Sequence, residues 1–100
     1  MKTTGETIRA KREEKGLFLR HISNKLKIDT AIISKIERGE RKATKKQIIM
    51  LAKILELDKE LLLIQYLSEK ILYEIKDEEL GMQALKVAEN NIKYNLKNNK

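Results

Sequence analysis

Apolar residues recur at spacings of three and four along most of this chain, and no segment alternates apolar and polar residues as a half-buried strand does. The 100 residues include no proline, and lysine, glutamate and leucine, which favour helices, are abundant. A chain of this length has room for one compact core. We therefore predict an all-α fold, with one small domain and a helical extension.

Capping signals divide the chain into separate helices. Asp29 precedes an apolar-rich segment that Gly39 ends, and Thr44 opens a capping box. The predicted helices cover residues 3–16, 19–26 and 30–37, and further helices start after Thr44 and after Asp58.

Positive charge is concentrated in the first part of the chain. Residues 1–57 hold 15 Lys or Arg against 7 Asp or Glu, which gives +8, whereas residues 58–100 hold 7 against 8, which gives −1. Basic surfaces bind polyanions by releasing condensed counterions, so nucleic acid or an anionic membrane is the expected class of partner. No apolar run approaches the roughly 20 residues of a membrane span, and the start of the chain lacks the apolar core of a signal peptide. We expect a cytoplasmic protein that does not enter a membrane.

Residue types that many enzymes need are scarce. The chain has no cysteine and a single histidine, His21. This excludes disulfide scaffolds, cysteine nucleophiles and cysteine zinc sites, and it leaves little scope for histidine catalysis. We predict no enzyme, no metal, no cofactor and no small-molecule ligand, and we expect His21 to be a solvated surface residue.

A turn of about three residues joins the second and third predicted helices, which makes a helix-turn-helix. Its second helix is short and carries small polar residues, as a helix in a major groove requires. The third predicted helix closes on the motif Ser34, Lys35, Ile36, Glu37, Arg38 and Gly39. With this motif, the segment 8–63 resembles the Cro and phage-repressor type (Xre-like) helix-turn-helix family, whose recognition helix ends on the same pattern. The resemblance implies a five-helix repressor-like domain over residues 1–63.

The resemblance implies which residues face DNA. Lys35 is the best candidate to reach guanine O6 and N7, and the methyl groups of Thr30 and Ala31 suit thymine. The family often makes a further contact through glutamine at the position of Leu19, and since leucine cannot donate, that contact is either lost or transferred to Arg20. The base-reading set is Thr30, Ala31, Ser34 and Lys35, and the phosphate-binding set is Arg20, Arg38, Arg41 and Lys42.

Two further expectations concern the frame of this motif. Arg12 and Glu37 match a family pair in which an arginine of the first helix meets a glutamate of the recognition helix in a partly buried ion pair. Lys27 stands where the family prefers glycine. It either adopts a left-handed conformation or the turn is a variant.

Residues 64–100 form the predicted helical extension. Its helices carry two apolar stripes, and since one helix on a small body has one side to bury, the second stripe favours a homodimer. A monomer whose last helix folds back is the alternative. Asp77 and Gly81 favour a helix break near residues 76–78, although a seven-residue apolar recurrence would also suit one long helix. The residues expected at the subunit contact are Tyr66, Tyr73, Leu80, Leu85, Val87, Ala88, Ile92 and Tyr94.

Together these patterns predict a nucleoid-associated transcriptional regulator, in particular a repressor, that binds an inverted-repeat operator in double-stranded DNA as a homodimer. A controller of a restriction-modification operon or an antitoxin-type regulator is the alternative within DNA binding. A protein-interaction module that keeps the helix-turn-helix only as a scaffold is an alternative of another class. A basic helical protein at anionic membranes is disfavoured, because the positive charge clusters around a turn and a cap.

Overall fold

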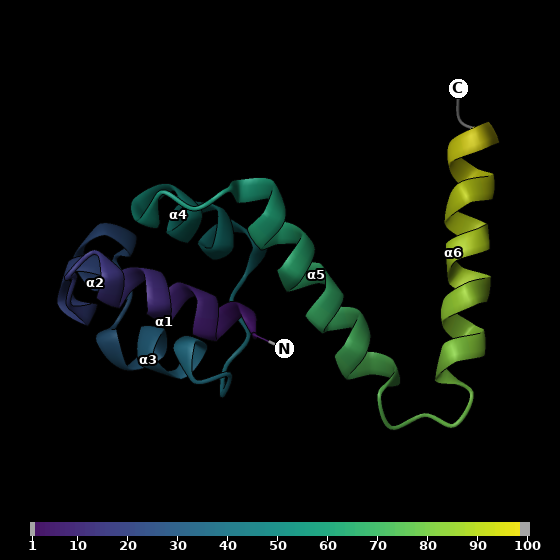
Figure 1. The fold of residues 1–100 in the computed structure, drawn as a ribbon, viewed down its shortest axis with the longest axis horizontal. Helices are drawn as coiled ribbons and strands as arrows, with labels where there is room; N and C mark the ends of the chain where they lie inside the picture. The colour runs from purple at the N-terminus through teal and green to yellow at the C-terminus, as the bar shows by residue number, and fades with distance from the viewer. Residues whose placement is uncertain (1, 99–100) are drawn as a thin grey trace. The chain divides into compact units, whose positions relative to one another are not determined.

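The computed structural model describes residues 2–98, which form six helices and no strand. The predicted all-helical fold is confirmed, whereas the count of five helices for a repressor-like domain is not, since six are present. The chain divides into two compact units after Glu69, and both this point and the predicted boundary after residue 63 lie within the helix Lys59–Ile75. The helices are α1 Thr4–Glu14, α2 Leu19–Leu26, α3 Thr30–Glu37, α4 Lys45–Leu55, α5 Lys59–Ile75 and α6 Gly81–Asn98 (Figure 1).

Local capping chemistry sets the bounds of the central helices. Asp29 Oδ1 accepts a hydrogen bond from Ala31 N at 2.9 Å at the start of α3. Gly39, with φ at 76°, lies just beyond the last residues of α3 in a left-handed conformation. At the start of α4, the side chains of Thr44 and Gln47 each accept a hydrogen bond from the backbone N–H of the other. These bonds satisfy amides that a helix start leaves without partners.

One apolar core holds the first unit together. Its members come from α1, α2, α3, α4 and the first half of α5. Burial of apolar surface in such a core is the main favourable term in folding. The largest fully buried side chains are Ile8, Ile22, Ile33, Ile48, Leu51 and Leu55.

Tyr66 belongs to this core, which corrects its assignment to a subunit contact. The residue is 7% exposed, and its hydroxyl donates a hydrogen bond to Ala43 O at 2.8 Å. Leu62, one turn earlier on α5, is buried on the same side. Leu62 and Tyr66 therefore define the buried face of α5. Ile64 and Leu72 lie on its other face and are exposed to solvent.

A break separates α5 from α6, as Asp77 and Gly81 predict. Residues 76–80 form turns rather than helix. Gly81 is buried against the end of α5, and a Cβ at this position would lie 2.6 Å from Ile75 O. The backbone therefore passes too close to α5 for any side chain at residue 81.

Candidate DNA-binding surface

The turn between α2 and α3 depends on a left-handed lysine. Lys27 has φ at 57° and ψ at 44°, which is a left-handed conformation. Of the two alternatives, a left-handed lysine or a variant turn, the first is therefore the one observed. A residue with a Cβ pays about 1 kcal/mol or more in this region. Ser23 compensates, because its carbonyl oxygen accepts from the N–H groups of Lys27 and Ile28 and its hydroxyl donates to Ile28 O. These bonds fix the direction in which the chain enters α3.

The two sides of α3 have opposite chemistry. On one side, Ile33, Ile36 and Glu37 are buried within the first unit. The other side presents the four residues predicted to read bases, which are small or cationic. Among them Ser34 is half-buried, and Thr30, Ala31 and Lys35 are exposed. The helix is thus held by one face and free to contact a ligand with the other.

An ion pair between Arg12 and Glu37 ties α3 to α1. Arg12 Nε donates to Glu37 Oε2 at 2.7 Å, and Arg12 Nη2 donates to Glu37 Oε1 at 3.1 Å. Arg12 Nη1 donates to Leu17 O at 2.9 Å, so the guanidinium also holds the segment before α2. The Glu37 side chain is 4% exposed. Its hydrogen bonds raise the pKa of Arg12, against the opposing effect of burial.

Gly5 brings the same two helices close together, a role that the sequence pattern did not reveal. A Cβ at residue 5 would lie 2.5 Å from Glu37 O, well inside the distance that a real Cβ reaches. The contact is with backbone atoms, which cannot rotate away as a side chain can. A glycine inside a helix, where it is unfavourable by about 1 kcal/mol relative to alanine, is the signal that could have pointed to this approach.

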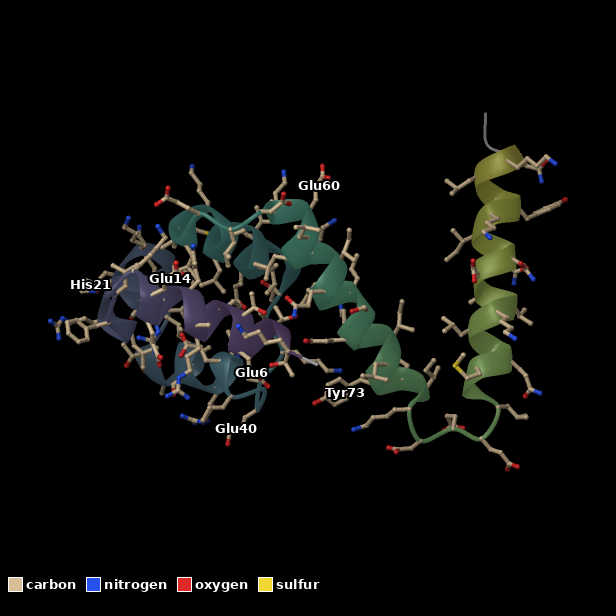
Figure 2. The ribbon with its side chains drawn as sticks, in the orientation of Figure 1. Glu6, Glu14, His21, Glu40, Glu60 and Tyr73 are labelled. Atoms are coloured by element: carbon tan, nitrogen blue, oxygen red, sulfur yellow. The ribbon has the colours of Figure 1, made fainter. Side chains whose placement is uncertain are left out.

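Three side chains interact at the end of α3. Arg38 Nη1 donates to Ser34 Oγ at 2.5 Å, one helical turn earlier. Arg38 Nε donates to Glu40 Oε2 at 2.5 Å. Glu40 reaches this position because its own N–H donates to Lys35 O at 2.8 Å, across the left-handed Gly39. Figure 2 labels Glu40 beyond the end of α3, with its side chain directed away from the first unit. The predictions from sequence gave Glu40 no role.

An exposed aromatic residue lies at the start of α2. The Phe18 ring is 56% exposed, and the guanidinium of Arg20 lies 4.5 Å from its centroid. His21, which is labelled in Figure 2, accepts a hydrogen bond at Nδ1 from Phe18 N at 2.9 Å. It therefore performs the capping function that glutamate or glutamine often has at the third helical position. This bond adds a structural contact to the solvated role expected of His21.

The remaining cations expected to bind phosphate occupy the connection from α3 to α4. Arg41 and Lys42 are exposed there, as Arg20 is on α2. Counted with Arg38, all four members of the predicted phosphate-binding set are exposed and belong to the first unit.

Apolar side chains remain exposed on α5 and α6. Of the residues predicted to meet a second subunit, Leu85 is half-buried and Tyr66 is in the core, as described above. The others are exposed, and they are Tyr73, Leu80, Val87, Ala88, Ile92 and Tyr94. The exposed face of α5 adds Leu61, Ile64, Leu67, Ile71 and Leu72.

Residues 2–98 contain no group of three or more His, Cys, Asp or Glu side chains placed to hold a metal ion. None of the described helices combines the length and the apolar character needed to cross a membrane.

Comparison with known protein families matches residues 7–62 to the family described as helix-turn-helix domain. The match covers more than half of the chain and includes all of α1 except its first turn, all of α2, α3 and α4, and the start of α5. Searches of curated proteins and of solved structures gave no significant match.

Proposed function

Because the chain belongs to the helix-turn-helix domain family, we propose that it is a transcriptional regulator that binds double-stranded DNA through α3. In this proposal it binds an inverted-repeat operator as a homodimer and represses by excluding polymerase. The observation that carries the proposal is the division of α3 into a buried apolar face and an exposed small, polar and cationic face. A helix anchored in this way has the size and the donors that a major groove accepts.

The charge distribution supports the same partner. Residues 1–57 carry a net charge of +8, from 15 basic and 7 acidic residues. In the proposal, Thr30, Ala31, Ser34 and Lys35 face base edges, while Arg20, Arg41 and Lys42 bind phosphates on either side. Phosphate contacts position a protein on the duplex, and base contacts give it specificity.

Salt dependence tests the DNA-binding proposal. A dimer that makes on the order of 6 to 10 phosphate contacts should lose about a thousandfold or more in affinity between 50 and 200 mM salt. The duplex would first be selected from a random pool, and its dissociation constant would then be measured over this range. Failure to select any preferred duplex would contradict sequence-specific binding, and a flat salt dependence would contradict the phosphate contacts.

Lys35 and Arg41 separate base reading from positioning. Lys35→Ala should weaken the best duplex by about 1 to 3 kcal/mol and relax the preference at one symmetric pair of positions. Arg41→Ala should weaken all duplexes by a similar factor and reduce the salt slope by about one unit. Binding to a duplex library with each base varied in turn measures both. The reverse pattern would place the recognition surface elsewhere.

The exposed face of α5 supports the homodimer. Five positions on one side of α5 are arranged symmetrically. The central residue is Ser68, and apolar residues lie seven and four positions before it and four and seven positions after it, so all five positions fall within one narrow stripe of the helix. A two-fold axis through Ser68 would bring two such stripes together in antiparallel orientation, each covering the same residues of the other. The small serine at the crossing point allows the helices to approach closely. The stripe consists of Leu61, Ile64, Ser68 and Leu72, which are exposed, and Ile75, which is half-buried.

A second candidate function rests on the same apolar surface. Side chains such as Leu80 and Tyr94, at 67% and 68% exposed, could bind another protein instead of a second copy. The helix-turn-helix would then serve as a scaffold, or the protein would combine DNA binding with a partner, as antitoxin-type regulators do. Sedimentation of the purified chain as a monomer at micromolar concentration would favour this candidate over the homodimer.

A further inference from the structure

The interactions of Arg38 place its guanidinium over the candidate base-reading face. Ser34 lies in the middle of the exposed side of α3, between the positions of Thr30, Ala31 and Lys35. Arg38 follows Ser34 by four residues and donates to its hydroxyl, so its side chain runs back along that side of the helix.

The carboxylate of Glu40 decides which ligand suits this arginine. The pair Arg38–Glu40 has no net charge, and the carboxylate repels a phosphate that approaches the same guanidinium. The edge of a guanine carries no charge and offers two acceptors, O6 and N7. A neutral ion pair therefore loses most of its attraction for phosphate but keeps its hydrogen-bond donors for a base.

The donor count leaves room for such a contact. A guanidinium has five N–H groups. Glu40 takes one from Nε and Ser34 takes one from Nη1, and 5 − 2 leaves three, on Nη1 and Nη2. A bidentate contact to guanine needs two N–H groups, so the three that remain are enough for it.

We propose that Arg38 reads a guanine in the major groove, with Ser34 and Glu40 as positioning residues that hold its guanidinium for the contact. The proposal rests on the proposed function and adds a second base-reading cation to Lys35. It changes the role expected of Arg38 from a phosphate contact to a specificity contact. The opposite possibility, that Arg38 binds phosphate and Glu40 competes with the DNA, makes contrary predictions.

The experiment compares Arg38→Ala, Glu40→Ala and the double variant on duplexes in which each base is varied in turn, with the salt slope measured for each. Glu13→Ala is the matched control. Glu13 accepts from Arg9 Nε at 2.8 Å in an exposed pair on α1, so its loss changes the net charge equally and frees Arg9, which has no role in the proposed contacts with DNA.

Arg38→Ala should weaken the best duplex by about 5- to 150-fold and abolish the preference for guanine at one symmetric pair of positions, with little change in the salt slope. Glu40→Ala should reduce the preference at the same pair, and the double variant should resemble Arg38→Ala. Glu40→Gln keeps an acceptor oxygen and should restore part of the preference. Glu13→Ala should leave the preference at every position as in the wild type.

Three results would overturn the inference in distinguishable ways. If Glu40→Ala tightens binding to all duplexes and steepens the salt slope by about one unit, Arg38 is a phosphate contact and Glu40 its competitor. If the wild-type chain selects no preferred duplex at all, the proposed function fails and the inference fails with it. Retained guanine preference in Arg38→Ala would reject the inference while leaving the proposed function intact.

Discussion

At the scale of single residues, Glu37 joins two helices through one carboxylate. Glu37→Ala leaves the Arg12 guanidinium, 12% exposed, without its charged partner, and breaking a buried pair in this way costs about 3 kcal/mol or more. We expect a loss of about 2–4 kcal/mol in urea unfolding, since Arg12 keeps its bond to Leu17 O. Glu14→Ala, which removes the exposed carboxylate of the Lys11–Glu14 pair on α1, should unfold close to the wild type. Equal losses would show that the Arg12–Glu37 pair acts like a surface pair.

The pH dependence of this effect follows from the charge on Arg12. Glu37 raises the pKa of Arg12 above its ordinary value. A group whose pKa is raised by folding contributes its stability at every pH below its unfolded pKa and loses it only as the pH rises through the folded value. The contribution of the Arg12–Glu37 pair should therefore be constant from neutral to mildly alkaline pH, and chemical denaturation of the wild type and of Glu37→Ala at pH 7 and pH 9 measures it as a difference in unfolding free energy. A difference that falls markedly by pH 9 would contradict a pair that keeps its charge over this range.

Gly5 sets the distance between α1 and α3, so its substitution should destabilise in spite of helix propensity. Gly5→Ala gains about 1 kcal/mol in propensity but forces a Cβ against the backbone of Glu37. We expect a net loss of about 1–3 kcal/mol, the usual range for overpacking. Ala10→Gly is the reverse exchange at an exposed position of the same helix and should lose about 1 kcal/mol. Stabilisation by Gly5→Ala in thermal unfolding would mean that α1 can shift away from α3.

At the scale of helices and turns, replacing Lys25 or Lys27 by glycine should change the free energy of unfolding in opposite directions. Lys27→Gly relieves the left-handed conformation and should stabilise by about 0.5–1 kcal/mol. Lys25→Gly, inside α2, should destabilise by a similar amount. Both variants lose one positive charge, so the effect of charge on stability cancels when their unfolding free energies are compared in the absence of DNA. A loss at both positions would indicate that the Lys27 side chain contributes more than its strain costs.

The bounds of α2 and α3 were predictable because local chemistry determines them. Asp29, Gly39 and the apolar spacing each act within one or two turns of the helix that they define. The role of Tyr66 was not predictable in this way. Two apolar faces of α5 have similar composition, and only the docking of α5 against the segment that contains Ala43 decides which of them is buried.

At the scale of the molecule, the exposed face of α3 follows from the sequence because its buried isoleucines leave one side for a ligand. Glu40 and Gly5 escaped prediction for physical reasons. Glu40 meets Arg38 only after the chain reverses at Gly39, and Gly5 matters only because α1 and α3 pack together. Contacts of this kind form between segments that only the folded structure brings together. The spacing of residues within one helix carries no information about them.

The proposed homodimer predicts an unusual sensitivity at Ser68. Because a two-fold axis through this residue brings it against its own copy, a large side chain here meets itself, and two arginines also repel. Ser68→Arg should therefore abolish self-association at micromolar concentration in sedimentation measurements and weaken operator binding in parallel. Ser68 is exposed and its hydroxyl donates only to Gln65 O at 2.8 Å, one turn earlier, so the fold of each copy should survive.

Ser68→Ala is the matched control at the same position, since it removes the hydroxyl without adding bulk, and it should associate as the wild type does. Val87→Asp, on the exposed surface of α6, reports whether that helix also contributes to the contact. If Ser68→Arg stays dimeric while Val87→Asp dissociates, the subunits meet through α6, and the symmetry of the α5 stripe about Ser68 plays no part in assembly. If both variants dissociate, the contact extends over both helices, and apparent operator affinity should fall for both at equal total protein concentration.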